Sequence, residues 1–161
     1  MDTSAAALER YLRGRIPVSV ALGVHVAQAG PECVRLTAPL TANVNHSGTV
    51  FGGSAAAVAT LAAWSLLHLR LEAAGLRART MIQRNDMEYE RPICGDFEAE
   101  CHLADGPVWE RFAALLKRRG RARLHLEAQL RCGGEPMGRF TGEFVALGTA
   151  FSMPDPLEAP A

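Results

Sequence analysis

The sequence predicts a single α+β domain in which one antiparallel sheet wraps around one long central helix. Three observations lead to this prediction. The stretch from Gly48 to Leu69 contains no Asp, Glu, Lys or Arg and is long enough for a buried helix. Segments on both sides of it alternate apolar and polar residues, as strands with one buried face do. Glycine and proline separate these segments where turns are needed. The expected order is helix, two strands, long helix and four strands.

Length and composition favour one globular domain, which we place at residues 1–150, followed by a proline-rich tail at 151–161 that we expect to be disordered. Of the 161 residues, 48% are hydrophobic, enough to form a core. The formal net charge is zero, so bulk charge gives no argument for a nucleic-acid partner or a membrane surface. The uncharged stretch also has the length of a membrane helix. It is mostly small residues and includes His68, so we expect it to be buried in protein.

The four cysteines are scattered, and no Cys-x-x-Cys pair marks a zinc or redox motif. Cys101 lies in an alternating segment and is expected to be a buried thiol. The first fifteen residues carry charges where a signal peptide would need an apolar run. These features favour a cytoplasmic, reducing location.

The N-terminal half begins with a short helix that Thr3 or Ser4 can cap. Alternating apolar residues from Val18 to Val26 predict a strand, which turns at Gly30-Pro31 into a second strand ending near Ala38. The polar loop TANVNHSGTVFGG leads into the long helix, expected from about Ser54 to Ala74. Gly75 is a natural C-terminal stop for that helix.

Four alternating segments follow the long helix. In the first, Met81, Met87 and Tyr89 are expected on one face, with Gln83 and Asn85 beside them. A short amphipathic helix opens at Pro107 and stops at Gly120, between the second and third of these strands. Gly133-Gly134 turns the chain into the last strand, near residues 140–147.

The segment NHSGTVFGGSAAAVATLAAW, together with YERPICGDF, resembles the YiiD-type thioesterases of the hot-dog superfamily. The similarity in architecture runs from about Ile16 to Leu147. The resemblance implies a hot-dog fold, a homodimer or larger homo-oligomer, and hydrolysis of an acyl thioester. Coenzyme A or phosphopantetheine would enter as part of the substrate, on acyl-CoA or an acyl carrier protein, and no metal or other cofactor is implied.

Gly52 and Gly53 stand just before the expected helix start, where free backbone N–H groups and the helix dipole can stabilise an oxyanion. The alternative is that the two glycines only permit a tight loop. Asn43 is a substrate-binding candidate, and Asn45 and His46 are candidates for orienting water or polarising the carbonyl. Their alternative roles are turn formation and loop hydrogen bonding.

Many relatives carry a catalytic carboxylate seven residues after the second glycine, and Thr60 occupies that position here. Threonine cannot act as a general base in the way Asp or Glu does. No Asp or Glu occurs between Gly48 and Leu71. Either Asn45, His46 and Thr60 together position a water, or another residue supplies the base, or hydrolysis is slow.

Two further groups are candidates for binding. Gln83 and Asn85 are expected to line an acyl pocket or a subunit interface, unless they pair with a neighbouring strand. Arg118, Arg119 and Arg121 belong to a basic run that can bind carrier phosphates or the acidic surface of a carrier protein, unless it is a solvated helix end.

Two other functions stay open at this point. The missing helix carboxylate favours an acyl-CoA or acyl-carrier binding module that does not hydrolyse its ligand. A hot-dog dehydratase is the second alternative, although that chemistry usually uses a histidine with a carboxylate.

Overall fold

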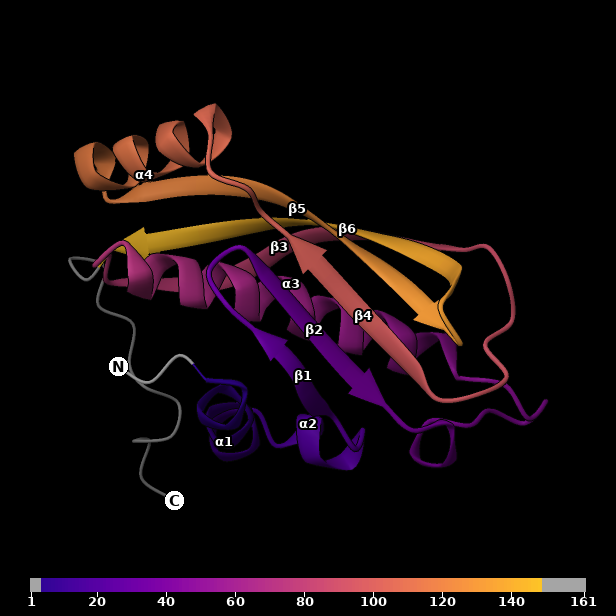
Figure 1. The fold of residues 1–161 in the computed structure, drawn as a ribbon. Coiled ribbons are helices and arrows are strands. Elements are labelled where there is room, and N and C mark those ends of the chain that lie inside the picture. The colour runs from indigo at the N-terminus through magenta and orange to yellow at the C-terminus, as the bar shows by residue number, and fades with distance from the viewer. Residues whose placement is uncertain (1–3, 149–161) are drawn as a thin grey trace, which may run out of the picture.

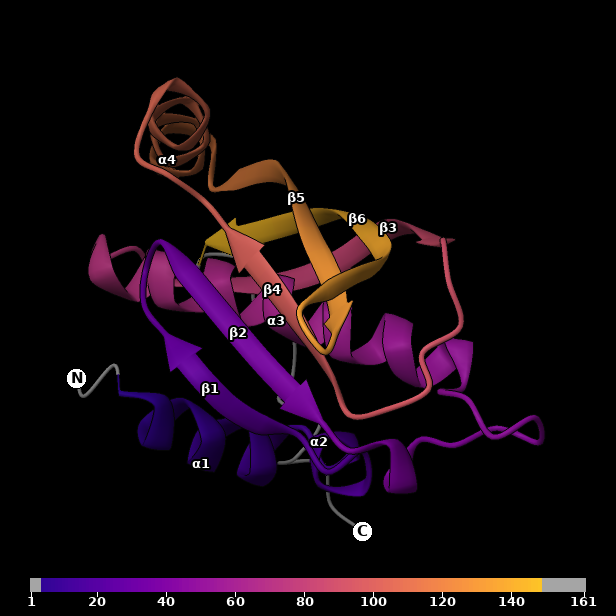
Figure 2. The same ribbon diagram turned by 45° about the vertical axis from the view of Figure 1, so that its right-hand side comes forward.

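A computed structural model describes residues 4–148 of the chain, and six antiparallel strands form one sheet around a central helix (Figures 1 and 2). In chain order the elements are α1 (Ala5–Arg15), α2 (Val18–Ala21), β1 (His25–Ala29), β2 (Cys33–Ala38), the 3-10 turn η1 (Leu40–Ala42), α3 (Gly52–Ala73), β3 (Ala78–Tyr89), β4 (Phe97–His102), α4 (Pro107–Arg119), β5 (Arg121–Cys132) and β6 (Glu135–Gly148). The strand order is β1-β2-β4-β5-β6-β3. The predicted fold class is confirmed. The tail expected at 151–161 lies outside the described residues.

The core lies between α3 and the inner face of the sheet. Val58, Ala62 and Leu66 of α3 have no exposed surface, and the alternating apolar residues of β5 face them. By length and composition α3 could cross a membrane, with a mean hydropathy of 1.3, but 67% of its apolar window is buried inside the protein. The helix is apolar on all sides because the sheet curls around it.

Ser4 caps α1, since its hydroxyl accepts a hydrogen bond from the backbone N–H of Ala7 at 3.2 Å. The strand predicted from Val18 is wrong over its first half. Residues 18–21 form the helix α2, in which Ser19 is buried while Val18 and Val20 are more than half exposed. Pro17, in the α region, starts this turn, and the strand begins only at His25. A helix of one turn is too short for its period to show in the sequence.

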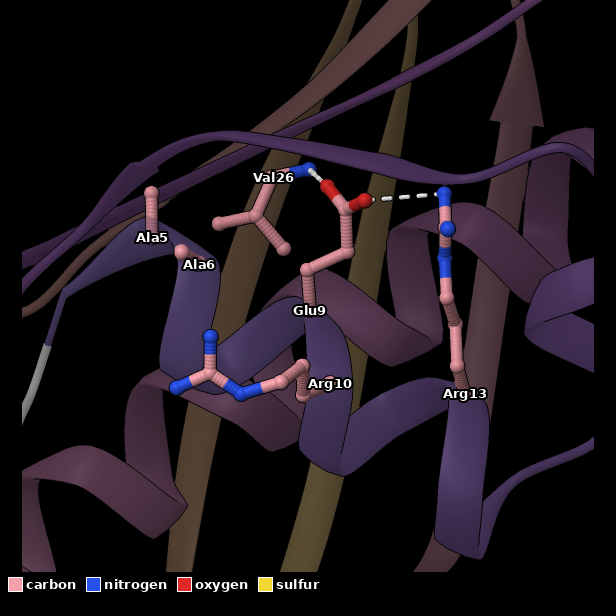
Figure 3. A pocket seen from close by; sticks show the side chains of 6 residues that line it. All are labelled: Ala5, Ala6, Glu9, Arg10, Arg13 and Val26. Atoms are coloured by element: carbon pink, nitrogen blue, oxygen red, sulfur yellow. Dashed lines mark hydrogen bonds and ion pairs between the residues drawn. The ribbon is translucent and has the colours of Figure 1, made fainter.

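The edge strand β1 is held by a carboxylate from α1. Glu9 accepts a hydrogen bond from the backbone N–H of Val26 at 2.9 Å and forms an ion pair with Arg13 at 2.8 Å. Figure 3 shows both contacts. The same residues border a pocket of about 370 Å³ between α1 and β1. The contact satisfies a donor on an edge strand that would otherwise be free to pair with another chain.

A bulge in β3 corrects the predicted face of that strand. Ile82 pairs with Phe144 of β6, but the next pair is Arg84 with Glu143, so Gln83 is the extra residue. Met81 is therefore 40% exposed, whereas Met87 packs against the core. The sequence expectation that Met81, Gln83 and Met87 share one face is wrong, because the bulge reverses the alternation between them.

Candidate functional site at the start of the central helix

A pocket of about 350 Å³ opens at the first turn of α3. It is lined by Thr49, Val50, Gly52, Ala55, Tyr89, Glu90, Arg91, Pro92 and Ile93. Phe51, the residue that precedes the helix, supplies no side-chain cap. The backbone N–H groups of the first turn are therefore not used by a capping side chain, at the positive end of a 22-residue helix.

Close packing against aromatic rings favours glycine at both position 52 and position 53. A Cβ on Gly52 would lie 3.2 Å from the ring of Tyr89, and one on Gly53 would lie 2.4 Å from the ring of Phe51. The Tyr89 hydroxyl also donates a hydrogen bond to the Gly52 carbonyl oxygen at 2.9 Å. Two aromatic rings thus cover the helix start, and a larger side chain at either glycine would push them away.

The side chain of Asn45 forms hydrogen bonds within the loop that precedes α3. Its Oδ1 accepts hydrogen bonds from the backbone N–H groups of Ser47 and Thr49 at 2.8 and 3.2 Å, and its Nδ2 donates to Thr49 Oγ1 at 2.9 Å. Thr49 in turn lines the pocket. His46 is exposed on this loop. Asn45 therefore shapes one wall of the pocket through Thr49.

Asn43 is buried beneath the same loop. Its Nδ2 donates to the carbonyl oxygens of Leu22 and Pro39 at 2.9 and 2.7 Å, while its Oδ1 is buried without a protein partner. The backbone N–H of Phe51 donates to the Asn43 carbonyl oxygen at 2.7 Å. Asn43 thus ties the residue before α3 to the segment before β1.

Thr60 lies two turns into α3 and is half-buried. Its hydroxyl donates a hydrogen bond to the Ala56 carbonyl oxygen at 2.8 Å, and Thr60 is not among the residues that line the pocket. Within residues 4–148 the structure shows no hydrogen bond that joins Thr60 to Asn45 or His46. The hydroxyl of Thr60 is therefore bonded to its own helix and not to the other two residues of the predicted catalytic set.

Glu90 is the carboxylate among the residues that line the pocket, and sequence reasoning missed it. The backbone N–H groups of Glu90 and Arg91 both donate to the Met137 carbonyl oxygen at 3.0 Å, which fixes this end of β3 against β6. The signal was present in the motif YERPICGDF, where the glutamate directly follows Tyr89. Only the fold shows that this motif faces the start of α3.

The other predicted binding residues lie elsewhere. Gln83 Oε1 accepts a hydrogen bond from Arg123 Nε at 2.9 Å, on the outer face of the sheet. Asn85 pairs with Gly142 and borders a separate pocket of about 320 Å³. Arg119 and Arg121 line a further pocket, of about 420 Å³, together with Leu115, Ala122 and Arg123. Arg118 is exposed at the C-terminal end of α4.

Known structures share this architecture. A protein of unknown function from Chlorobaculum tepidum TLS is 26% identical, with a TM-score of 0.85, covering 90% of this chain and 94% of that chain. A "putative thioesterase" from Shewanella oneidensis is 24% identical, with a TM-score of 0.80, covering 91% of this chain and 99% of that chain. A protein from Pseudomonas aeruginosa described as "Probable Thioesterase" is 25% identical, with a TM-score of 0.78, covering 89% of this chain and 95% of that chain.

A family model settles the assignment that these structures suggest. The family described as "Putative thioesterase (yiiD_Cterm)" matches residues 5–148, which is nearly all of the described part of the chain. The match includes the glycine pair at the start of α3 and the YERP motif. The chain belongs to this YiiD C-terminal thioesterase family and has its hot-dog fold.

Proposed function

We propose that the protein hydrolyses an acyl thioester carried by coenzyme A or by an acyl carrier protein, with the reacting carbonyl at the start of α3. One observation carries the proposal: the first turn of α3 has no side-chain cap and opens into a pocket of about 350 Å³ that Glu90 also lines. Membership of a thioesterase family supports the reaction class. The N–H groups of Gly52 and Gly53 would bind the oxyanion of the tetrahedral intermediate.

Glu90 is the base in this proposal. Its carboxylate would take a proton from a water molecule as that water attacks the thioester carbonyl carbon. Negative charge then develops on the carbonyl oxygen near the N–H groups of Gly52 and Gly53. Collapse of the intermediate breaks the C–S bond, and the leaving thiolate takes up a proton to give the free thiol. Asn45 contributes by holding Thr49 in the pocket wall.

The proposal includes a homodimer or larger homo-oligomer. β3 is the outer strand of the sheet on one side, has 12 residues and leaves Met81 and Tyr89 exposed. A long, uncovered edge strand has unpaired backbone N–H and C=O groups that can pair with a second chain. Pairing of β3 with the β3 strand of another copy would extend the sheet and cover Tyr89 beside the pocket. The four cysteines are all free thiols, which suits the cytoplasmic location we propose.

A non-hydrolytic acyl-carrier binding module is the second candidate. The observation in its favour is that α3 carries no carboxylate at the position of Thr60, whose hydroxyl is bonded to its own helix. A dehydratase has less support. Among the ion pairs that the structure shows in residues 4–148, His46 is not paired with a carboxylate.

The test is release of free thiol from a series of acyl-CoA thioesters and from acylated carrier protein. We expect Glu90→Gln to lower kcat by ~10²–10⁴-fold while the protein stays folded, because a positioned base contributes about that much. Glu110→Gln, at an exposed position in the first turn of α4, is the matched control and should leave the rate unchanged. A wild-type protein that retains acyl-CoA in native mass spectrometry but releases no thiol would establish the binding module instead.

A further inference from the structure

Three potential metal ligands from two neighbouring strands meet on the outer face of the sheet. They are Cys33 at the start of β2, and Glu100 and His102 near the end of β4. Cys33 pairs directly with His102 in the β2–β4 register, and residues 100 and 102 share a face because a strand has a period of two. One ligand atom from each lies within 4.8 Å of the other two.

The geometry suits a zinc ion. Cys33 Sγ lies 3.8 Å from His102 Nε2, and His102 Nε2 lies 2.9 Å from Glu100 Oε1. Zinc with bonds of about 2.3 Å to sulfur and about 2.0 Å to nitrogen holds such donors roughly 3.5 Å apart at tetrahedral angles. The Cys33–His102 separation is slightly longer than this value and the His102–Glu100 separation slightly shorter, so small side-chain rotations would admit the ion. A thiolate, an imidazole and a carboxylate together select zinc over magnesium or calcium.

Surrounding contacts hold these side chains in place. Arg35 lies on the same face, with its Nη1 3.8 Å from Glu100 Oε2, so one carboxylate oxygen faces Arg35 while the other faces His102. Such support of a ligating carboxylate is typical of metal sites. The nearby chain is also fixed: Arg70, buried near the end of α3, donates to the carbonyl oxygens of Pro31 and Leu103 at 3.0 and 3.4 Å.

The same Arg70 contacts place the strand ends that carry this cluster near the C-terminal end of α3, across the sheet from it, whereas the thioester pocket lies at the N-terminal end of α3. We infer that Cys33, Glu100 and His102 form a zinc-binding site, separate from the thioester pocket, with the fourth position open to water or another ligand. Residue 33 meets residues 100 and 102 only through the pairing of β2 with β4, so no zinc motif is visible in the sequence.

Cobalt is the probe, because its spectrum reports both a thiolate ligand and tetrahedral geometry. Tag-free, full-length protein would be titrated with Co²⁺ under reducing conditions, followed by Zn²⁺. We expect one equivalent of cobalt, a thiolate-to-cobalt charge-transfer band, visible bands of tetrahedral cobalt, and loss of all of them on addition of zinc. Cys33→Ser should abolish the charge-transfer band. The matched control Cys94→Ser, at an exposed cysteine outside the cluster, should keep it.

His102→Gln and Glu100→Gln extend the test to the other two ligands. Each should raise the Kd for cobalt by at least about tenfold, which is the smallest loss usual even for supporting residues of metal sites. Circular dichroism would check that each variant is folded, which the exposure of His102 favours. Absence of a charge-transfer band in the wild type, or a band that survives Cys33→Ser, would overturn the inference and leave a surface hydrogen bond between His102 and Glu100.

Discussion

The hydroxyl of Tyr89, the last residue of β3, donates a hydrogen bond at 2.9 Å to the carbonyl oxygen of Gly52, the first residue of α3. This contact joins the outer edge strand of the sheet to the start of the central helix. It also places the Tyr89 ring where a side chain on Gly52 would have to be. Any second chain that pairs with β3 would therefore act directly on the geometry of the pocket.

Tyr89→Phe removes the hydroxyl and keeps the ring. We expect a loss of about 0.5–1.5 kcal/mol of stability, the usual net value of one hydrogen bond, and a fall in kcat because the helix start is held less firmly. Tyr89→Ala also removes the wall of the pocket and should raise KM as well. Urea unfolding and thiol-release kinetics would measure both effects. Equal kinetics for wild type and Tyr89→Ala would show that the pocket is not the site of hydrolysis.

Thr60 is open to a rescue experiment. If Thr60 occupies the position where relatives carry their carboxylate, Thr60→Asp in the Glu90→Gln background should recover part of the lost thiol release. The gain depends on ionisation of the new side chain, because a half-buried position raises the pKa of a carboxylic acid. Rates should therefore be measured from pH 6 to about pH 9, with Thr60→Asn as the matched uncharged variant. Recovery that is equal for Asp and Asn would exclude general-base catalysis from residue 60.

The sequence predicted the fold because each buried face has its own period. The uncharged run forms α3, and the apolar members of the alternating pattern in β5 face the core. It failed where one residue or one turn changes the direction of the chain, as in α2 and at Gln83. It also could not place Glu90 beside Gly52 or Cys33 beside His102, since these contacts depend on strand register between distant segments.

The predicted carrier role of the basic run can be tested at the pocket beside α4. Arg119, Arg121 and Arg123 line it together, and Arg123 donates a hydrogen bond to Gln83 and lies 3.8 Å from Glu143. Replacing Arg118, Arg119 and Arg121 with glutamine should raise KM for acyl-CoA several-fold at low salt and flatten its salt dependence. A matched glutamine replacement of the exposed Arg10 should do neither. Normal KM for the triple variant at low salt would identify the run as a solvated helix end.

His68 should make folding stability depend on pH. Its ring stacks with the rings of Tyr11 and Trp64 at centroid distances of 4.8 and 5.0 Å, and its Nε2 lies 3.6 Å from Glu72 Oε1. Burial lowers the pKa of His68, and the opposing attraction of Glu72 is the smaller effect. As pH falls through about 6.5, the ordinary histidine value, the unfolded chain binds a proton that the folded chain resists, so stability falls.

His68→Phe keeps an aromatic ring in the stack and removes the titrating group. Urea unfolding of wild type and variant at pH 7.5, 6.5 and 5.5 would isolate this contribution, because the other titrating groups are common to both proteins. We expect the wild type to lose more stability than His68→Phe as pH falls. Glu72→Gln removes the attraction that favours the charged form and should make the loss steeper than in the wild type. Parallel pH dependences for wild type and His68→Phe would mean that the folded protein accepts the proton on His68 as readily as the unfolded chain does.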